Sequence, residues 1–359
     1  MKRRKFLAGA GLAAAGAHVA MPAVAQSAPR VEWRLASSFP SSFEAIWAGA
    51  LTIAQSVREQ SEGRFTIETN PAGAIVGALD VFDAARAGKI DCAQTALTYF
   101  WGVEPALVFA TGAPFGMNAR EQNAFFRQGG GADLINDTLA DHGLVALAAG
   151  NTGCHMGGWF RNEITSAADL RGLKFRISGF PAKILQTLGV EPKGMGRGEL
   201  ASALSSGALD GAAWVSPVDD EKLGLSKVAP NYYYPGWFQS GMAIHLAINA
   251  GKWNELPRAY QAMLRAACDT ANVDTQARYD AANPPALRRL AEAGAKLRAF
   301  PPDVMEACWQ ATQAVYRDTA AKDAKFRRLH DAWTDFRNDQ YLWWQVAEYN
   351  YDNFMIRAR

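Results

Sequence analysis

The stretch LRGLKFRISGF, residues 170–180, combines a turn, a strand pattern and an arginine at the end of the strand. Apolar residues at 173, 175 and 177 alternate with polar residues at 174, 176 and 178, which is the period of a β-strand. Gly172 marks a turn before this strand, and Ser178-Gly179 marks a loop after it. A guanidinium fixed at a strand end suits bidentate capture of a carboxylate, although many such arginines simply lie in solvent. The surrounding segments must therefore show whether Arg176 binds a ligand.

The first 25 residues have the pattern of an export signal. A basic start at residues 2–5 precedes an apolar run of small residues and an Ala-X-Ala site at 23–25. The Arg3-Arg4 pair resembles a twin-arginine signal, which implies export after folding. A membrane anchor is the alternative, but the run contains Gly, His and Pro and is short for a membrane span. We expect residues 1–25 to be removed and the mature protein to be periplasmic.

The charge of the mature chain excludes some classes of partner. The full chain has 37 basic and 35 acidic residues, and removal of the four basic residues at 2–5 leaves 33 basic residues. A nearly neutral chain without a Lys/Arg block has no electrostatic footprint for nucleic acid. The four cysteines lack the paired spacing of zinc sites, so we expect buried free thiols, with the disulfide state left open. They are Cys92, Cys154, Cys268 and Cys308.

The first part of the mature chain alternates between strand and helix patterns. Strands are predicted at 31–36, 64–69 and 90–94, and helices at 44–62 and 76–87. This alternation is typical of an open α/β sheet. We expect residues 26–149 to form a first lobe, completed by part of about 240–285.

A second α/β set begins near Gly150 and forms the predicted second lobe, residues 150–238, completed by later helices. It contains the Arg176 strand, and the other predicted elements are a brief helix at 166–170, helices at 182–188 and 198–206, and a strand at 209–215. The rest of the chain is mainly helical, with predicted segments at 255–282, 284–297, 302–319 and 321–357, and residues 285–359 form a C-terminal helical region. Because ligands of open α/β sheets lie beyond the carboxyl ends of the strands, a cleft between the lobes would hold the ligand.

The ordered motifs of the mature chain resemble those of the extracytoplasmic solute receptors of tripartite ATP-independent periplasmic (TRAP) transporters, closest to the branch that binds 2-oxo acids. The matching segments are VFDA at 81–84, PFGM at 114–117, GGG at 129–131, AGNTG at 149–153, MGGWFR at 156–161, LKFRI at 173–177, GALDGA at 207–212 and YYYPGW at 232–237. The resemblance implies a two-lobed α/β fold with long C-terminal helices, whose lobes close over a small 2-oxo or 2-hydroxy monocarboxylate and deliver it to the membrane subunits.

The resemblance also assigns candidate ligand-binding residues. Arg176 matches the arginine that holds the carboxylate, and Trp214 matches the aromatic residue that packs on the ligand. Either aromatic candidate, Trp214 or Tyr99, could instead be an ordinary core residue. The remaining candidates are the first-lobe loop residues Ser38 and Phe39, Tyr99 after the third strand, Asn151, His155 and Gln239.

Three positions depart from the members of the family that use a metal. There, a glutamine, a glutamate and a polar residue hold a cation beside the ligand, and this chain has His155, Ala213 and Gln239 at those positions. Sodium and calcium prefer oxygen donors, and the only formal negative charge of the set is missing at Ala213. Weak metal ligands could remain in Gln239 and the backbone at Trp214. We therefore expect that the acid binds without a sodium or calcium bridge, that His155 takes over part of the role of the cation, and that no other cofactor is used.

The end of the chain is unusually aromatic. Such a helix either packs across both lobes or presents an apolar face to a second subunit. In this respect the chain resembles receptors of the 2-oxo-acid branch, in which a C-terminal helix helps to build a dimer. We therefore expect a homodimer. The aromatic residues concerned are Trp333, Phe336, Tyr341, Trp343, Trp344, Tyr349, Tyr351 and Phe354.

Three alternatives remain from the sequence. An enzyme is disfavoured, because the chain lacks a G-x-S-x-G elbow, an H-E-x-x-H pair, a P-loop and a dinucleotide-binding glycine motif. A periplasmic ligand sensor cannot be distinguished from a transport receptor, since both use lobe closure. Finally, Ala213 in place of a larger residue leaves room for a larger or aromatic organic acid.

Overall fold

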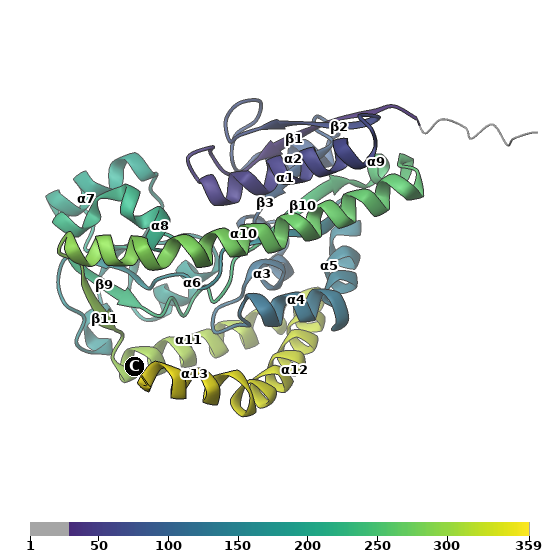
Figure 1. Cartoon of the computed structure of the whole chain (residues 1–359). Coiled ribbons are helices and arrows are strands. Elements are labelled where there is room, and N and C mark those ends of the chain that lie inside the picture. The colour runs from purple at the N-terminus through teal and green to yellow at the C-terminus, as the bar shows by residue number, and fades with distance from the viewer. Residues whose placement is uncertain (1–28, 359) are drawn as a thin grey trace, which may run out of the picture.

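The computed structural model describes residues 29–358 as two β-sheets, several helices packed against them and an extended helical C-terminus (Figure 1). The predicted export signal lies outside the described residues. The α/β class and the two-lobed arrangement predicted from the sequence are confirmed, and each lobe is built around one sheet.

The first lobe is built on a five-stranded sheet with the order β2-β1-β3-β10-β4. Its strands are β1 Val31–Ser37, β2 Phe65–Asn70, β3 Cys92–Thr95, β4 Leu144–Asn151 and β10 Ala243–Asn249. β1 runs parallel to β2 and β3, whereas β10 runs antiparallel to β3 and β4. The strand periods did not predict β4 or β10, because both are nearly continuous apolar runs, which periodicity cannot distinguish from buried helix.

Of the two helices predicted in the first lobe, one is confirmed and one is shorter than predicted, and the remaining helices of this lobe were not predicted. Helix α1, Glu44–Gln60, buries Ile46, Ile53 and Val57 on one face, at the spacing that its apolar period predicted. Helix α2 spans only Val81–Arg86, whereas the sequence predicted a helix over 76–87. Residues 71–80 form successive turns instead, in which the N–H groups of 73, 74 and 80 donate to nearby carbonyls. The other helices of this lobe are α3 Val108–Thr111, α4 Ala119–Gln128 and α5 Gly131–Ala140, with 3-10 turns η1 Leu97–Phe100 and η2 Pro105–Leu107.

The second lobe is built on a six-stranded sheet of short strands with the order β11-β9-β5-β8-β6-β7. Its strands are β5 Gly158–Phe160, β6 Lys174–Arg176, β7 Glu191–Lys193, β8 Gly211–Ala212, β9 Asn231–Tyr234 and β11 Lys296–Ala299. The strand predicted at 209–215 is reduced to two residues, because the N–H of Val215 donates to the Asp220 carboxylate rather than to a neighbouring strand. The helical elements are η3 Ala167–Leu170, α6 Phe180–Thr187, η4 Arg197–Glu199, α7 Leu200–Ser206, α8 Pro217–Asp220, η5 Glu221–Leu223 and η6 Leu225–Lys227.

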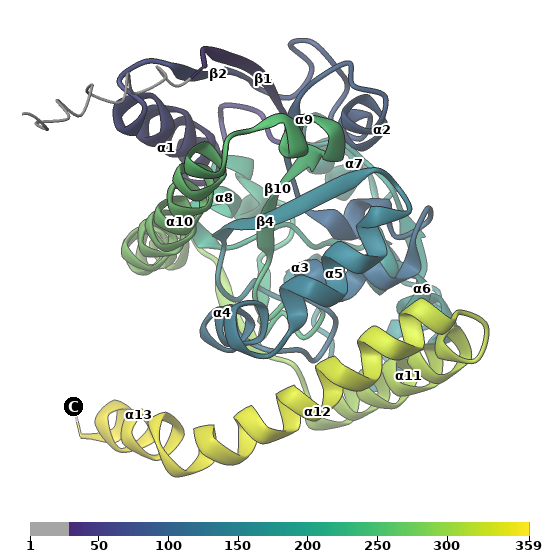
Figure 2. The same cartoon turned by 90° about the vertical axis from the view of Figure 1, so that its right-hand side faces the viewer.

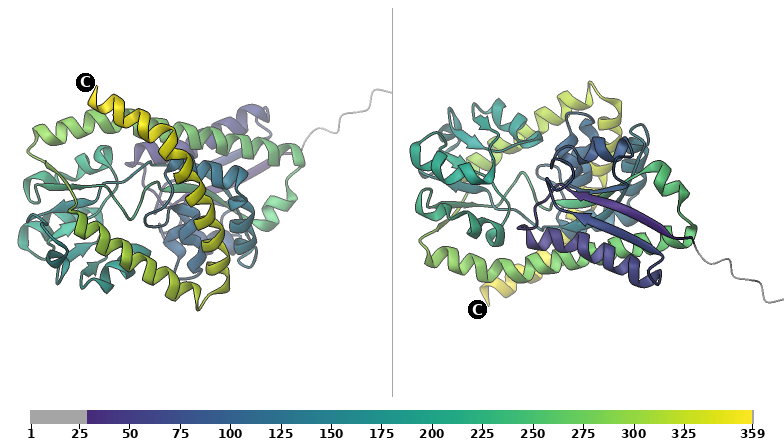
Figure 3. Two further views of the ribbon diagram at one scale, coloured as in Figure 1. Left: turned by 90° about the horizontal axis from the view of Figure 1, so that it is seen from below. Right: turned by 90° about the horizontal axis from the view of Figure 1, so that it is seen from above.

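One helix joins the two lobes along their length. After the short α9, Ala250–Glu255, helix α10 runs from Arg258 to Glu292 and packs against α1 and β4 of the first lobe and α8 of the second (Figures 1 and 3). The predicted break near 283 is wrong, since Pro284 and Pro285 lie inside the helix. Proline removes a backbone donor from a helix, and here the packing of α10 against both lobes outweighs that loss.

The C-terminal helices run across the outside of the molecule. They are α11 Pro302–Ala320, α12 Ala324–Val346 and α13 Glu348–Arg357, so the segment predicted at 321–357 is interrupted at Ala347. Helix α11 packs on α6 and α12 packs on α5, whereas α13 projects away from the body (Figure 2). No helix within residues 29–358 is both long and apolar enough to cross a membrane.

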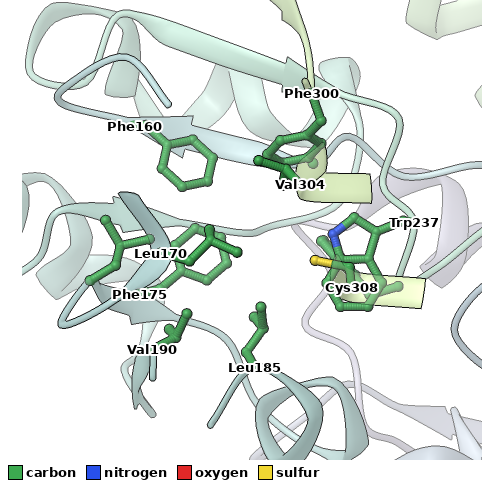
Figure 4. Close-up of a pocket in the computed structure, with 12 residues that line it drawn as sticks. Phe160, Leu170, Phe175, Leu185, Val190, Trp237, Phe300, Val304 and Cys308 are labelled. Atoms are coloured by element: carbon green, nitrogen blue, oxygen red, sulfur yellow. The ribbon is translucent and has the colours of Figure 1, made fainter. Parts of the chain in front are cut away.

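The interior of the second lobe is closed by apolar packing. A small apolar cavity of about 20 Å³ lies between the second sheet and α11, surrounded by Phe160, Phe175, Phe300 and Cys308 (Figure 4). This space is too small for an organic ligand and is a packing gap of the core. Three of the four cysteines are buried free thiols as predicted, but Cys154 is exposed.

The candidate ligand-binding cleft

A cavity of about 390 Å³ lies between the two lobes. The first lobe contributes the loop after β1 and the 3-10 turn after β3, and the second lobe contributes the segments that follow β6 and β8. Two segments that cross between the lobes add His155 and Gln239. The cavity thus lies where strands from both sheets end, which is where open α/β folds bind ligands. Seven of the eight predicted ligand-binding residues line it: Ser38, Phe39, Tyr99, His155, Arg176, Trp214 and Gln239.

Arg176 is the charged residue of the cavity wall. Its Nη1 donates to the Ala213 carbonyl at 2.8 Å and its Nε donates to the Met195 carbonyl at 3.2 Å, so the side chain is fixed at the end of β6. Among residues 29–358, no acceptor is hydrogen-bonded to Nη2, which remains open to a ligand. Burial lowers the pKa of Arg176, and Tyr99 and Asp220 oppose that effect. The guanidinium stays charged at neutral pH, because arginine begins from a pKa above 12.

Aromatic rings from both lobes surround this cation. The guanidinium carbon lies 4.5 Å from the centroid of the Trp214 ring, within the range of a cation–π interaction. Trp214 in turn stacks on Phe43 of the first lobe, with centroids 5.9 Å apart. The Tyr99 and Phe39 ring centroids are 6.1 Å apart, and desolvation raises the pKa of the Tyr99 hydroxyl to about 12, although the residue is 41% exposed. The Tyr99 hydroxyl is therefore a neutral hydrogen-bonding group at physiological pH.

His155 and Gln239 are held by the segments that connect the lobes. His155 is buried, and its ring Nε2 is 2.9 Å from the Thr152 hydroxyl. The backbone N–H of His155 donates to the backbone carbonyl of Gln239. Burial lowers the pKa of His155 to about 3, so the imidazole is neutral. The Gln239 side chain donates to the Gly241 carbonyl at 2.9 Å. A Cβ on Gly112 would lie 2.2 Å from both Gln239 Nε2 and the Gly241 carbonyl oxygen, and the clash with the backbone oxygen explains the glycine.

Two predicted candidates have their polar groups occupied by the protein. The Asn151 amide donates to Gln122 at 2.9 Å and its oxygen accepts the Gly153 N–H, and the residue does not line the cavity. These hydrogen bonds stabilise the crossing segment, and ligand contact by Asn151 stays a prediction. Ser38 lines the cavity, but its hydroxyl is 2.7 Å from the Thr95 hydroxyl.

Several lining residues were not predicted from the sequence, and four of them are aromatic. They include Phe43, Trp101, Phe180 and Phe238. Trp101 of the first lobe meets Phe180 of the second lobe edge to face, with centroids 5.8 Å apart. The available signal was proximity in sequence, since each lies within four residues of a predicted candidate. That signal is weak, because most aromatic residues in a protein of this size belong to the core.

A buried carboxylate supports the segment that carries Trp214. Asp220 accepts hydrogen bonds from the Val215 N–H at 3.0 Å, the Tyr232 hydroxyl at 2.8 Å and the Trp159 indole at 3.1 Å. Burial raises the pKa of Asp220 to about 7, although these three donors oppose the shift. Asp220 thus fixes the backbone that follows Ala213, and it interacts electrostatically with Arg176.

The cavity wall does not fit a hard metal ion. It contains no carboxylate, and residues 29–358 contain no cluster of three or more His, Cys, Asp or Glu that could hold a metal. The Ala213 carbonyl already accepts a hydrogen bond from Arg176. Sodium and calcium require several oxygen ligands, so the residues present offer a poor donor set for either ion.

Fold and cleft together define a two-lobed receptor for a small anionic molecule. Residues 37–323 match the family of bacterial extracellular solute-binding proteins, family 7 (DctP). The chain therefore belongs to this family of solute-binding proteins.

Its relatives include proteins with named ligands. The chain is 40% identical, over 99% of each sequence, to a monocarboxylate 2-oxoacid-binding periplasmic protein of Nostoc. It resembles a TRAP transporter solute-binding protein of Bordetella bronchiseptica with calcium and picolinate bound, at 39% identity and a TM-score of 0.88, covering 92% of this chain and 98% of that one. A second TRAP protein, from Colwellia psychrerythraea with calcium and pyruvate, is 33% identical with a TM-score of 0.87, covering 90% and 99% of the two chains.

Proposed function

We propose that this chain is the periplasmic receptor of a TRAP transporter. It captures a small 2-oxo or 2-hydroxy monocarboxylate between its lobes and delivers it to the membrane subunits. Relatives with 33–40% identity are named for 2-oxo acids or were solved with pyruvate, and this supports the ligand class. Export through the twin-arginine signal and residence in the periplasm are part of the same proposal.

The observation that carries the proposal is the open end of the Arg176 guanidinium. Two protein carbonyls orient the side chain, and Nη2 is left for the ligand carboxylate. Hydrogen bonds to a charged group contribute about 1.5–3 kcal/mol each. Micromolar affinity requires about 8 kcal/mol, so the aromatic walls and lobe closure have to supply the remainder. The neutral His155 ring and the Tyr99 hydroxyl are suited to the 2-oxo or 2-hydroxy group.

The lobes are already connected across the mouth of the cleft. Lys222 of the second lobe donates to the Glu44 carboxylate at 3.1 Å and to the Ser42 carbonyl at 3.2 Å, both in the first lobe. Together with the Phe43 and Trp214 stack, this contact ties the two walls of the cavity. A ligand that contacts both walls therefore stabilises the closed arrangement.

Replacing Arg176 tests the proposal. Arg176→Ala should lower the affinity for pyruvate or 2-oxobutyrate by at least a hundredfold in titration calorimetry, because the carboxylate loses its charged partner. Arg288→Ala, which removes an exposed arginine of α10, is the matched control and should bind like the wild type. A thermal unfolding curve should show that both variants fold. Unchanged affinity in Arg176→Ala would exclude the proposed site.

We also propose that the acid binds without a metal bridge. The support is the absence of a carboxylate from the cavity wall, in a chain whose relatives were solved with calcium or sodium. Affinity for the acid should therefore change by less than twofold when millimolar calcium is replaced by EDTA in a sodium-free buffer. A strong loss of affinity in EDTA that calcium restores would contradict this part of the proposal.

A homodimer formed through the C-terminal helices is the last element of the proposal. Large apolar residues of α12 and α13 are exposed, such as Trp343 at 55% and Phe354 at 68%. One similar structure, from Bordetella bronchiseptica, is described as a dimer. A second copy that covers these helices would remove the apolar face from water.

A further inference from the structure

The cavity is larger than the smallest acids of the proposed ligand class require. A water molecule takes about 30 Å³ in the liquid, and a three-carbon acid takes roughly three to four times that volume. The cavity has a volume of about 390 Å³, so pyruvate would leave most of it to water. The cavity therefore has room for an acid larger than pyruvate.

The chemistry of the wall defines that larger acid. Arg176 is the only residue with a formal charge among those that line the cavity, so a second carboxylate on the ligand would have no partner. The wall contains the neutral polar side chains of Ser38, Thr98, Tyr99, His155, Ser178 and Gln239, and apolar and aromatic side chains such as Leu79, Val108, Phe180 and Met242 outnumber them. A dicarboxylate or a sugar acid would bury polar groups there without hydrogen bonds, which is costly.

Two aromatic pairs each take one ring from each lobe. Phe43 stacks on Trp214, and Trp101 meets Phe180 edge to face. All four residues line the cavity, so an apolar body enclosed there touches rings from both lobes. Such a body would hold the lobes together in addition to the carboxylate contact.

We infer that this receptor selects 2-oxo or 2-hydroxy monocarboxylates with a branched or aromatic side chain of about four to eight carbons over pyruvate. The inference rests on the proposed function and specifies the ligand of the same site. Each methylene moved from water into an apolar wall tightens binding by about fourfold. Three additional carbons therefore correspond to a gain of roughly tenfold to sixtyfold.

A series of acids tests the inference by titration calorimetry on the mature protein. The series is pyruvate, 2-oxobutyrate, 2-oxo-4-methylpentanoate and phenylpyruvate, with succinate as a dicarboxylate. Affinity should rise at least tenfold from pyruvate to 2-oxo-4-methylpentanoate or phenylpyruvate, and succinate should not bind. If pyruvate binds as tightly as both larger acids, the inference is overturned and the proposed function stands. If no monocarboxylate binds, both are overturned.

Variants of Trp101 locate the side-chain pocket. Trp101→Ala should weaken the larger acids by at least tenfold and pyruvate by less than threefold, because the change removes wall that pyruvate does not reach. Trp101→Leu, which keeps an apolar side chain, should recover part of the loss and controls for folding. Trp343→Ala on the exposed face of α12 is the matched tryptophan control. An equal loss for pyruvate and the larger acids in Trp101→Ala would overturn the inference.

Discussion

Two arginine and tryptophan pairs in this molecule differ in what surrounds them. In the cleft, the Arg176 guanidinium lies 4.5 Å from the Trp214 ring and its oriented contacts are to neutral carbonyls. The second pair joins α4 to the C-terminal helices: the Arg120 guanidinium lies 5.5 Å from the centroid of the Trp344 ring. Arg120 is exposed and forms an ion pair with the Glu348 carboxylate. The comparison teaches that a cation beside an aromatic ring does not define a ligand site. The cation must also be enclosed and lack a carboxylate partner.

The largest expected effect is a change of oligomeric state caused by substitutions in α13. Phe354→Asp combined with Ile356→Asp places charge on the apolar face of α13, where these side chains are 68% and 75% exposed. The proposed dimer should dissociate to monomer in sedimentation at micromolar concentration, because a buried unpaired charge is strongly unfavourable.

Ligand affinity of the same variant shows whether the cleft is independent of the C-terminal helices. The double variant should bind the acid within twofold of the wild type, because α13 contributes nothing to the cavity. A wild-type protein that is monomeric throughout would remove the dimer from the proposal. Loss of ligand binding together with the dimer would break the comparison between the two regions.

The next effect concerns the tryptophans. Trp214→Ala removes a cation–π contact and a stacked pair, which are worth about 0.5–2 and 0.5–1.5 kcal/mol. Affinity for the acid should fall roughly tenfold to a hundredfold in titration calorimetry. Trp344→Ala removes the corresponding ring beside Arg120 and should leave the affinity unchanged. Equal effects of the two substitutions would show that the cleft pair has no special role.

The smallest effect is a dependence of affinity on pH. Asp220 has a pKa of about 7, raised mainly by burial, and it interacts electrostatically with Arg176. A bound carboxylate at Arg176 would raise the Asp220 pKa further, so binding takes up a proton. Affinity should therefore increase by about twofold to fivefold as the pH falls from 8 to 6. His155, with a pKa of about 3, and Tyr99, with a pKa of about 12, do not titrate in this range. Asp219, which interacts with Asp220 and whose pKa burial raises to about 6, titrates at its lower end.

Two variants assign this pH dependence. Asp220→Asn should abolish the change between pH 7 and 8, where Asp219 with its pKa of about 6 is already ionised, with affinity measured by calorimetry at pH 6, 7 and 8. Glu348→Gln, at the carboxylate that pairs with Arg120, should keep the wild-type dependence. A slope that persists between pH 7 and 8 in Asp220→Asn would assign the proton to another group.

Sequence reasoning predicted the local features of the cleft and missed those that depend on distant packing. The strand that ends at Arg176 could be predicted because its alternation and its flanking turns lie within a few residues. The cavity wall at Trp101 and Phe180 could not, because these residues meet across the lobes from positions far apart in the sequence. A motif register likewise does not reveal that the Asn151 amide donates to Gln122.

The same distinction applies to the helices. Helix α1 follows its apolar period, because one face alone packs on the lobe. The break predicted near 283 is absent, because tertiary contacts along α10 override the local effect of Pro284 and Pro285. Sequence patterns therefore predict a helix correctly when it packs by one face on one lobe, as α1 does. They fail for α10, because contacts with both lobes determine its length.

The continuity of α10 restricts how the molecule can open. With 35 residues, the helix is about 52 Å long at 1.5 Å per residue, and it is fastened to both halves of the protein. Such a rod resists stretching, so the halves can swing relative to each other but cannot slide apart. Tyr279 and Asn283 already bond residues of the second lobe, so Pro284 and Pro285 lie within the part of the rod that is fastened to that lobe. The swing is therefore confined to the stretch between Asp274, which bonds Thr52 of the first lobe, and Tyr279.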